Sequence, residues 1–212
     1  MKDRIFVIDG SSYLYRAFHA MPPLSTSSGK PTGAVKGVTN MLMNLKKDSE
    51  GSPIIVVFDA KGKTFRNDIY SEYKANRPPM PDELREQLVP VKSICRSIGF
   101  PLIEIEGVEA DDVIATISRM AKNAKFKCVI SSLDKDLMQL YRKDVRIFDP
   151  MKNKFITPED IVIKFGVGPE KVIDVQSLAG DSSDNVPGVP GIGVKTAAEL
   201  INKYGTLEKL LD

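Results

Sequence analysis

The stretch Gly107-Val108-Glu109-Ala110-Asp111-Asp112-Val113-Ile114 places three acidic residues directly before an apolar pattern with helical spacing. Acidic residues in the first turn of a helix are common, because the free amide groups and the helix dipole favour negative charge there. The same arrangement recurs elsewhere in the chain, however, at the ends of strand-like segments. Residues 107–114 are therefore expected to form the centre of a functional site.

Apolar runs that end in an acidic residue occur at several places in the chain. Asp9 and Asp59, for example, each follow a short run of aliphatic and aromatic residues. In a parallel sheet such residues meet at one edge, and clustered carboxylates stay charged only beside a counter-cation. The sequence thus predicts a divalent-metal site that can hold two Mg²⁺ ions, with Mn²⁺ as an expected substitute. The candidate ligands are Asp9, Asp59, Glu109, Asp111, Asp112, Asp134, Asp136, Asp181 and Asp184.

The composition is typical of a soluble globular protein, with 42% hydrophobic and 27% charged residues in 212. No apolar run approaches the roughly 18 residues needed to span a bilayer, and no signal-peptide pattern is present, so no membrane partner is expected. Cys95 and Cys128 lie in apolar patterns, which indicates core positions and a reducing compartment. With His19 as the single histidine, a zinc site of Cys/His type and a His-activated nucleophile are excluded. The net charge of +2 is too small to identify a partner.

Strand-like and helix-like segments alternate over the first three quarters of the chain. The second strand is apolar throughout, which indicates burial on both faces and a parallel sheet. We predict an α/β fold with a mostly parallel central sheet and helices on both faces, in residues 1–165, followed by a helix-hairpin-helix region in residues 166–212. No GxGxxG follows the first strand, so a dinucleotide site has little support. The expected strands are 4–8, 53–58, 102–105, 127–131 and 145–148, and none is expected after Thr157.

Basic and aromatic residues alternate in the segment that follows the second strand. Cations neutralise phosphates and aromatic rings stack on unpaired bases, so the segment is suited to single-stranded nucleic acid. The alternative is a solvated loop whose aromatic residues pack on the core. The nearby acidic cluster favours nucleic-acid binding. The residues are Lys61, Lys63, Arg66, Tyr70, Tyr73, Lys74 and Arg77.

The Gly/Pro-rich segment 188–196 precedes a helical pattern. A P-loop is excluded, because Lys195 stands one position too late and no strand precedes the glycines. A helix-hairpin-helix fits better: Gly191 and Gly193 let the turn approach a duplex, while Lys195 and Thr196 at the next helix start meet a phosphate. Such a contact is independent of base sequence. The alternative is a tight turn between two packed helices.

Five motifs together closely resemble the 5′-nuclease domain of bacterial DNA polymerase I, in the flap endonuclease family, and the resemblance covers essentially the whole chain. The motifs are Val7-Ile-Asp9-Gly-Ser-Ser-Tyr-Leu-Tyr-Arg16, Val57-Phe-Asp59-Ala-Lys-Gly-Lys-Thr-Phe-Arg66, Gly107-Val-Glu109-Ala-Asp-Asp112, Leu133-Asp134-Lys-Asp136 and Gly180-Asp181-Ser-Ser-Asp184-Asn.

The resemblance implies a PIN-like 5′-nuclease fold and a division of the acidic residues between two metal ions. Positions matching Asp9, Asp59, Glu109 and Asp111, with Asp112 beside them, serve one ion. Those matching Asp134, Asp136, Asp181 and Asp184 serve the other. All nine positions are acidic in this chain, so nothing indicates an inactive or one-metal variant.

The resemblance also implies the roles of basic and aromatic residues. Residues 61–81 match a flexible arch through or under which the 5′ strand passes. In that arch, Lys74 and Arg77 match basic residues that contact phosphates, and Tyr73 matches an aromatic residue that stacks on a base. Arg16 matches a basic residue near the scissile phosphate, and the hairpin at 188–196 matches a duplex-binding element that often holds K⁺.

The implied activity is that of a Mg²⁺-dependent 5′→3′ exonuclease and flap endonuclease in DNA replication and repair. Its substrate would be DNA with a 5′ flap or a 5′ end at a duplex junction, cut to a 5′-phosphate and a 3′-hydroxyl. A monomer in the bacterial cytoplasm, associated with the nucleoid, is expected, with a polymerase domain in the parent chain as one option. Family domains continue for several tens of residues beyond the hairpin, so a truncated form or a short stand-alone member is expected.

Two further functions fit parts of the pattern. A structure-specific DNA-binding module would use the hairpin and the arch without turnover, and gaps in the acidic set would have favoured it. A PIN-like ribonuclease shares the acid-tipped strands, although it usually has fewer acidic residues and lacks the C-terminal hairpin. A preference for RNA over DNA would distinguish the ribonuclease from the DNA nuclease.

Overall fold

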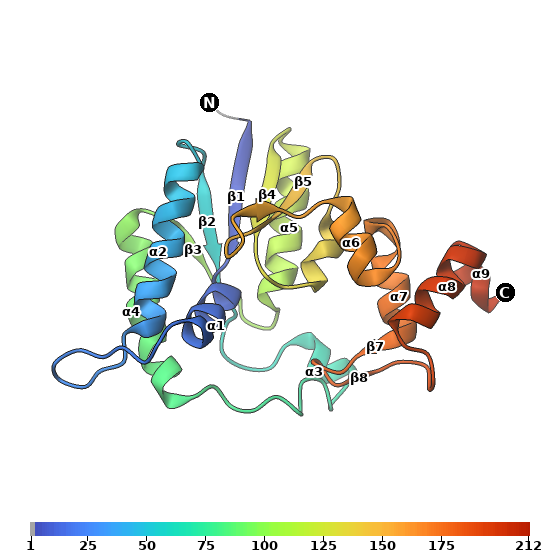
Figure 1. Ribbon diagram of the computed structural model, residues 1–212, viewed down its shortest axis with the longest axis horizontal. Helices are drawn as coiled ribbons and strands as arrows, with labels where there is room; N and C mark the ends of the chain where they lie inside the picture. Colours follow the sequence, from blue (N-terminus) through green and yellow to red (C-terminus); the bar gives the residue numbers. More distant parts are fainter. Residues whose placement is uncertain (1–2) are drawn as a thin grey trace.

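The computed structural model describes residues 3–212 and contains a central sheet of six strands in the order β3-β2-β1-β4-β5-β6 (Figure 1). All neighbours in this sheet are parallel except β5 and β6, and β7 and β8 form a separate antiparallel pair. The strands are β1 (Arg4–Asp9), β2 (Ile54–Val57), β3 (Leu102–Ile103), β4 (Lys127–Ser131), β5 (Val145–Asp149), β6 (Lys154–Phe155), β7 (Gly180–Asp181) and β8 (Val186–Pro187).

Helices cover both faces of this sheet. Figure 1 shows α1, α2 and α4 gathered on one side of β1 and the helices from α5 onward on the other. The α-helices are α1 (Gly10–Ala20), α2 (Gly33–Asp48), α3 (Phe65–Ile69), α4 (Asp82–Ile98), α5 (Ala110–Asn123), α6 (Pro158–Phe165), α7 (Val172–Ala179), α8 (Val194–Tyr204) and α9 (Leu207–Leu211). Two short 3₁₀ helices, η1 (Asp136–Leu140) and η2 (Pro169–Lys171), complete the set for residues 3–212.

The strand β1 supplies side chains to both hydrophobic clusters of the protein. Phe6 and Ile8 pack in a cluster with α1, α2 and α4, whereas Val7 packs in a second cluster with α5 and the C-terminal helices. This follows from the strand itself, because successive side chains point to opposite faces of a sheet. The apolar runs of the sequence are therefore strands buried on both faces, and the predicted α/β architecture is confirmed.

Several local details differ from the sequence expectations. The sequence predicts a first helix from Tyr13 to Ala20, but the helix begins at Gly10, because the Asp9 carboxylate accepts a hydrogen bond from Ser12 N and caps the helix directly after β1. The sequence of residues 61–81 has neither a strand pattern nor a clean helical pattern, yet the short helix α3 lies inside this segment. None of the helices in the described part of the chain is long and apolar enough to cross a membrane.

The expectation that strands end before Thr157 is wrong for β7 and β8, which form a small hairpin after α7. Two-residue strands carry no readable alternation, so sequence periodicity could not identify them. The hairpin depends on close backbone approach: Gly180 has a φ of 71°, and a Cβ there would lie 2.3 Å from Gly188 N. It carries the loop 181–185 back toward the edge of the main sheet, where Asp181 and Asp184 meet the other acidic residues.

Candidate active site

The carboxyl ends of β1, β2 and β4 open into an acidic cleft of about 550 Å³. A second pocket, of about 380 Å³, shares several of the same side chains and adds Asp112 and Asp181. The structure therefore brings all of the predicted acidic residues into one region of the molecule. Those that line the larger cleft are Asp9, Asp59, Glu109, Asp111, Asp134, Asp136 and Asp184.

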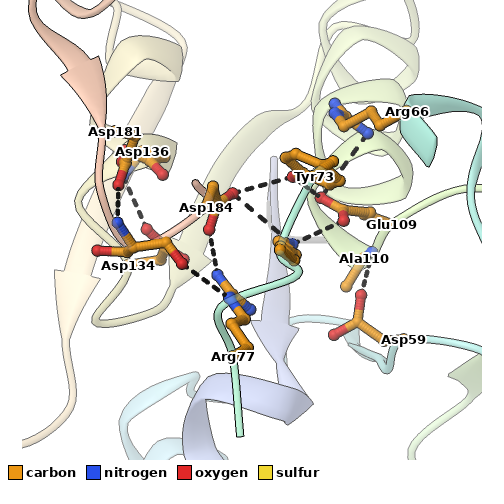
Figure 2. A network of polar contacts seen from close by, with 12 residues as sticks. Asp59, Arg66, Tyr73, Arg77, Glu109, Ala110, Asp134, Asp136, Asp181 and Asp184 are labelled. Carbon is orange, nitrogen blue, oxygen red and sulfur yellow. Dashed lines mark hydrogen bonds and ion pairs between the residues drawn. The ribbon is translucent and has the colours of Figure 1, made fainter. Parts of the chain in front are cut away.

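Two of the strand-end carboxylates are held by hydrogen bonds from neighbouring turns. Asp9 is 4% exposed; its Oδ1 accepts from Ser12 N at 2.9 Å and its Oδ2 from Ser132 Oγ at 2.6 Å. Asp59 Oδ1 accepts from Ala110 N, the first residue of α5, at 2.8 Å (Figure 2). These bonds tie the ends of β1 and β2 to β4 and α5, so the carboxylates are fixed by the fold before any ligand binds.

The start of α5 uses its acidic residues in different ways. Glu109 is the N-cap, and the Asp112 side chain accepts from Glu109 N at 3.0 Å, which completes a capping box. Arg66 donates to both oxygens of Asp112, at 2.6 and 2.9 Å, and this contact lowers the pKa of that carboxyl. Asp112, expected among the metal ligands, and Arg66, expected to contact DNA, are thus paired with each other. Together they anchor α3 to α5.

The centre of the cleft strongly disfavours unbalanced negative charge. Burial, with repulsion from Asp134 and Asp9, raises the pKa of Asp111 to about 8. Burial likewise raises the pKa of Asp9 to about 6. A proton or a cation relieves this repulsion, and a set of oxygen ligands without Cys or His suits a hard divalent ion such as Mg²⁺. The donor chemistry therefore fits the predicted metal.

Basic side chains, rather than open space, face several of these carboxylates. Lys74 Nζ lies 2.6 Å from Glu109 Oε1, and Lys135 Nζ lies 2.6 Å from Asp181 Oδ2. Arg77 pairs with Asp184 (Figure 2). Within residues 3–212, no three Asp, Glu, His or Cys side chains stand in an arrangement that could hold an ion. Metal binding would have to displace these cations.

Tyr73 lies differently from the exposed stacking aromatic that was expected. Its side chain is 9% exposed, and its hydroxyl bridges Glu109 Oε2 at 3.0 Å and Asp184 Oδ2 at 2.9 Å (Figure 2). Burial, followed by the charge of Glu109, raises the pKa of Tyr73. Because the hydroxyl satisfies two carboxylates, the ring is held inside and cannot stack on a base in this conformation.

The arch is fastened to the loop that carries Asp184 through contacts that we call the arch latch, between residues 72–77 and 182–185. Asn76 Nδ2 donates to Ser182 O at 2.8 Å, and Asn185 Nδ2 donates to Glu72 O at 2.7 Å. Lys74 N also donates to Asp184 O at 2.8 Å. Residues 72–77 of the arch therefore lie against the loop that carries Asp184, beside the cleft.

Removing both amide side chains of the arch latch is expected to release the arch. Each such hydrogen bond contributes about 1 kcal/mol, so Asn76→Ala with Asn185→Ala should increase the population of the open arch by about 30-fold. Limited trypsin digestion, which cuts after lysine and arginine residues of the arch, measures that opening. Asn202→Ala, which removes a comparable amide-to-carbonyl bond to Gly166 elsewhere, is the control. Equal digestion rates for the double variant and the control would contradict the latch.

The remaining predicted residues lie at three places. Arg16 lines the cleft from α1 and is exposed. Lys61 and Lys63 are exposed at the start of the arch, and Tyr70 is half-buried. The two glycines of the hairpin lie in the exposed turn before α8, where Gly191 has a φ of 80° and Gly193 is the N-cap without a side chain. The lysine and the threonine are exposed in the first turn of α8. These last residues are Gly191, Gly193, Lys195 and Thr196.

Sequence patterns did not identify several side chains that shape the cleft. Lys135 stands between Asp134 and Asp136 in the chain, and that position was the one available signal for it. Gln176 of α7 donates to Asp136 Oδ1 at 2.6 Å. Lys164 of α6 and His19 of α1 also line the cleft. Gln176, Lys164 and His19 reach the site only because the helices that carry them pack beside it.

Two family models together match residues 4–212. A model of the N-terminal, resolvase-like domain of 5′-3′ exonucleases matches residues 4–166, and a model of their C-terminal SAM fold matches residues 167–212. The chain belongs to the 5′-3′ exonuclease family. The resemblance inferred from the five sequence motifs is thereby confirmed.

Curated members of the 5′-3′ exonuclease family align along nearly all of this chain. DNA polymerase I of Pseudomonas aeruginosa is 54% identical over 95% of the chain, which spans 22% of that relative's length. The 5′-3′ exonuclease of Aquifex aeolicus is 46% identical over 98% of the chain, which spans 72% of that relative. The chain thus corresponds to about a fifth of the polymerase and to most of the separate exonuclease.

Solved structures of this family share the fold. The bacteriophage T5 5′-exonuclease with bound divalent zinc ions superposes with a TM-score of 0.82 at 26% identity, covering 99% of this chain and 78% of that one. The T5 flap endonuclease in a pseudo-enzyme–product complex with DNA and metal ions superposes with a TM-score of 0.81 at 27% identity, with the same coverage. The parallel sheet with its C-terminal helical region is therefore the fold of this family.

Proposed function

We propose that this chain is a metal-dependent 5′ nuclease that hydrolyses DNA phosphodiester bonds, as a 5′→3′ exonuclease and a 5′-flap endonuclease. The observation that carries the proposal is the acidic cleft, in which carboxylates from three parallel strands and from the loop 181–185 lie beneath a basic arch. A cluster with only a structural role would not require a carboxyl group whose ionised form is so strongly disfavoured that its pKa is raised to about 8, as at Asp111.

Two groups of carboxylates would hold the metal ions. Asp9, Asp59, Glu109 and Asp111 form one candidate group, and Asp134, Asp136, Asp181 and Asp184 the other. We propose Mg²⁺ as the ion, with Mn²⁺ as a substitute. When bound, such ions supply Lewis acidity at the phosphodiester and lower the pKa of water. The fold already holds Asp9 and Asp59 at the edge of the sheet by hydrogen bonds, whereas Glu109, Asp181 and Asp184 would first have to exchange their basic partners for a metal ion.

The basic side chains of the arch would position the nucleic acid. Lys74 and Arg77 now neutralise Glu109 and Asp184. With Glu109 and Asp184 engaged by metal ions, the ammonium group of Lys74 and the guanidinium group of Arg77 would be free to bind the phosphate of the strand. Arg16 would contact the same region from α1. Release of Tyr73 from its two carboxylates would expose a ring that can stack on a base, which is the role expected from the family resemblance.

The C-terminal helices would hold the duplex part of the substrate. The turn that ends at Gly193 is exposed, and the first amides of α8 lack a side-chain cap, so a backbone phosphate can bind there with Lys195. A K⁺ ion at this turn, a monomeric state and a polymerase domain elsewhere in the parent chain belong to the same proposal. So does the division into a nuclease domain, residues 1–165, and a helix-hairpin-helix region, residues 166–212.

Cleavage of an end-labelled 5′-flap duplex tests the proposed function. The chain should cut near the flap junction with Mg²⁺ and not with EDTA, and a matched single-stranded RNA should survive. Binding of the flap duplex without cleavage in Mg²⁺ would favour a DNA-binding module. Faster cleavage of the RNA than of the flap DNA would favour a ribonuclease.

A further inference from the structure

The acidic cleft has basic side chains of two kinds. Those of the arch and of Lys135 are paired with carboxylates, as described above. Lys164 also lines the cleft and is exposed, but it makes no ion pair or hydrogen bond through its ammonium group with any residue from 3 to 212. Its charge is therefore available to a ligand.

The packing of α6 fixes the position of Lys164. Thr157 caps the helix by accepting from Asp160 N, and α6 buries Ile161 (0% exposed) and Phe165 (3% exposed) in the cluster that contains α5 and α8. The helix ends at Phe165, and at its C-cap Gly166 a Cβ would lie 2.6 Å from Ala198 Cβ of α8. With that side of α6 buried, the lysine at position 164 is presented toward the cleft.

Arg16 lines the same cleft from the other face of the sheet. Its helix α1 packs in the cluster with α2 and α4, whereas α6 packs in the opposite cluster. Arg16 likewise makes no ion pair within residues 3–212. The cleft thus has an acidic floor and one unpaired cation from each side (Figure 1 shows α1 and α6 on different sides of β1). A polyanion that crosses such a floor needs cations to offset the repulsion.

We propose that Lys164 binds a backbone phosphate of the nucleic-acid strand that crosses the cleft, on the side of α6. The assignment rests on the proposed function, because it names a further contact for the same substrate. Lys164 has a competing structural role: it stands in the last turn of α6, where a cation interacts favourably with the helix dipole. The experiment must separate these two roles.

Lys122 provides a matched control. It is an exposed lysine in the last turn of α5, so it has the same relation to a helix dipole, and it does not line the cleft. It stands at the end of α5 away from Asp111, about 16 Å along the helix. Lys164→Glu and Lys122→Glu change the net charge equally, so a difference between them reports position and not total charge.

The test measures the Kd of a fluorescein-labelled 5′-flap duplex by anisotropy, with Ca²⁺ in place of Mg²⁺, over a range of salt concentrations. Lys164→Ala should weaken binding about three- to tenfold, and the slope of log K against log salt should become shallower by about 0.7, the value for one phosphate of a single strand. Lys164→Glu should weaken binding of the duplex further. Lys164→Arg and Lys122→Glu should both bind the duplex like the wild type.

Melting temperatures of all variants complete the design. A wild-type Kd and salt slope for Lys164→Ala would overturn the assignment. So would a loss of affinity that tracks a lower melting temperature and is not repaired by Lys164→Arg, because the lysine would then only support α6. Failure of the wild-type chain to cut the flap duplex would refute the proposed function but leave the Lys164 contact testable by its Kd, whereas failure to bind the duplex would refute both.

Discussion

Asp111→Asn is expected to reduce cleavage of a 5′-flap DNA by about 10³-fold or more in Mg²⁺, while the protein remains folded. Asp111 lines both pockets of the site, and its charge is opposed by Asp134, Asp9 and Asp59. An amide keeps the shape of the side chain but cannot supply the negative charge that a divalent ion requires. Single-turnover cleavage measures the loss, and turnover near the wild-type rate would remove Asp111 from the metal-binding set.

The same substitution provides a test that does not depend on activity. The pKa of Asp111 is raised from 3.8 to about 8, so between these values the folded state binds a proton that the unfolded chain has lost. Asp111 therefore makes the metal-free protein progressively less stable as the pH rises through this window. Asp111→Asn lacks this effect.

In EDTA, the stability of Asp111→Asn relative to the wild type should increase from about pH 5 to about pH 7.5, by roughly 2–4 °C in Tm for each kcal/mol. Comparing the two proteins cancels the opposite contributions of carboxyls with lowered pKa, such as Asp112. Saturating Mg²⁺ should reduce the difference, because binding favours the ionised carboxylate. A constant difference between the two proteins across the pH range would show that Asp111 ionises freely in the fold.

Lys74→Ala is expected to have the second largest effect, lowering cleavage by about 10²-fold. Its ammonium group lies 2.6 Å from Glu109 and 3.8 Å from Asp184. It is therefore a cation in the centre of the site, where it would attract a phosphate of the substrate. The side chain is 25% exposed, and the loss of one partly exposed ion pair should lower the free energy of unfolding by only about 1 kcal/mol. Activity should therefore fall far more than stability.

Removing Lys74 has two consequences: the loss of a phosphate contact and the release of Glu109. A measurement of magnesium binding separates them. Because the ammonium group occupies Glu109, Lys74→Ala should bind Mg²⁺ more tightly than the wild type in the absence of DNA, as measured by titration calorimetry. Lys63→Ala, an exposed arch lysine outside the cleft, should leave Mg²⁺ affinity unchanged. A large drop in melting temperature for Lys74→Ala, with cleavage lost in proportion, would instead assign Lys74 a structural role.

The alternation of apolar strands and amphipathic helices, with acidic residues after several of the strands, determined the architecture and the general place of the site. Parallel strands buried on both faces place their carboxyl ends at one edge, so Asp9, Asp59 and Asp134 were predictable neighbours although they are far apart in the chain. Glu109 and Asp112, which the sequence predicted as metal ligands, form a capping box in the structure, as their three-residue spacing permits.

Tertiary structure decided which charge each acidic residue meets. Arg66 pairs with Asp112, Tyr73 bridges Glu109 and Asp184, and the arch latch joins residues more than a hundred positions apart. Lys164 reaches the cleft because α6 packs on α8. Sequence spacing fixes only contacts within a helix turn or along a strand. Pairings between a loop and a distant hairpin depend instead on how the helices pack on the sheet, and that packing is a property of the whole fold.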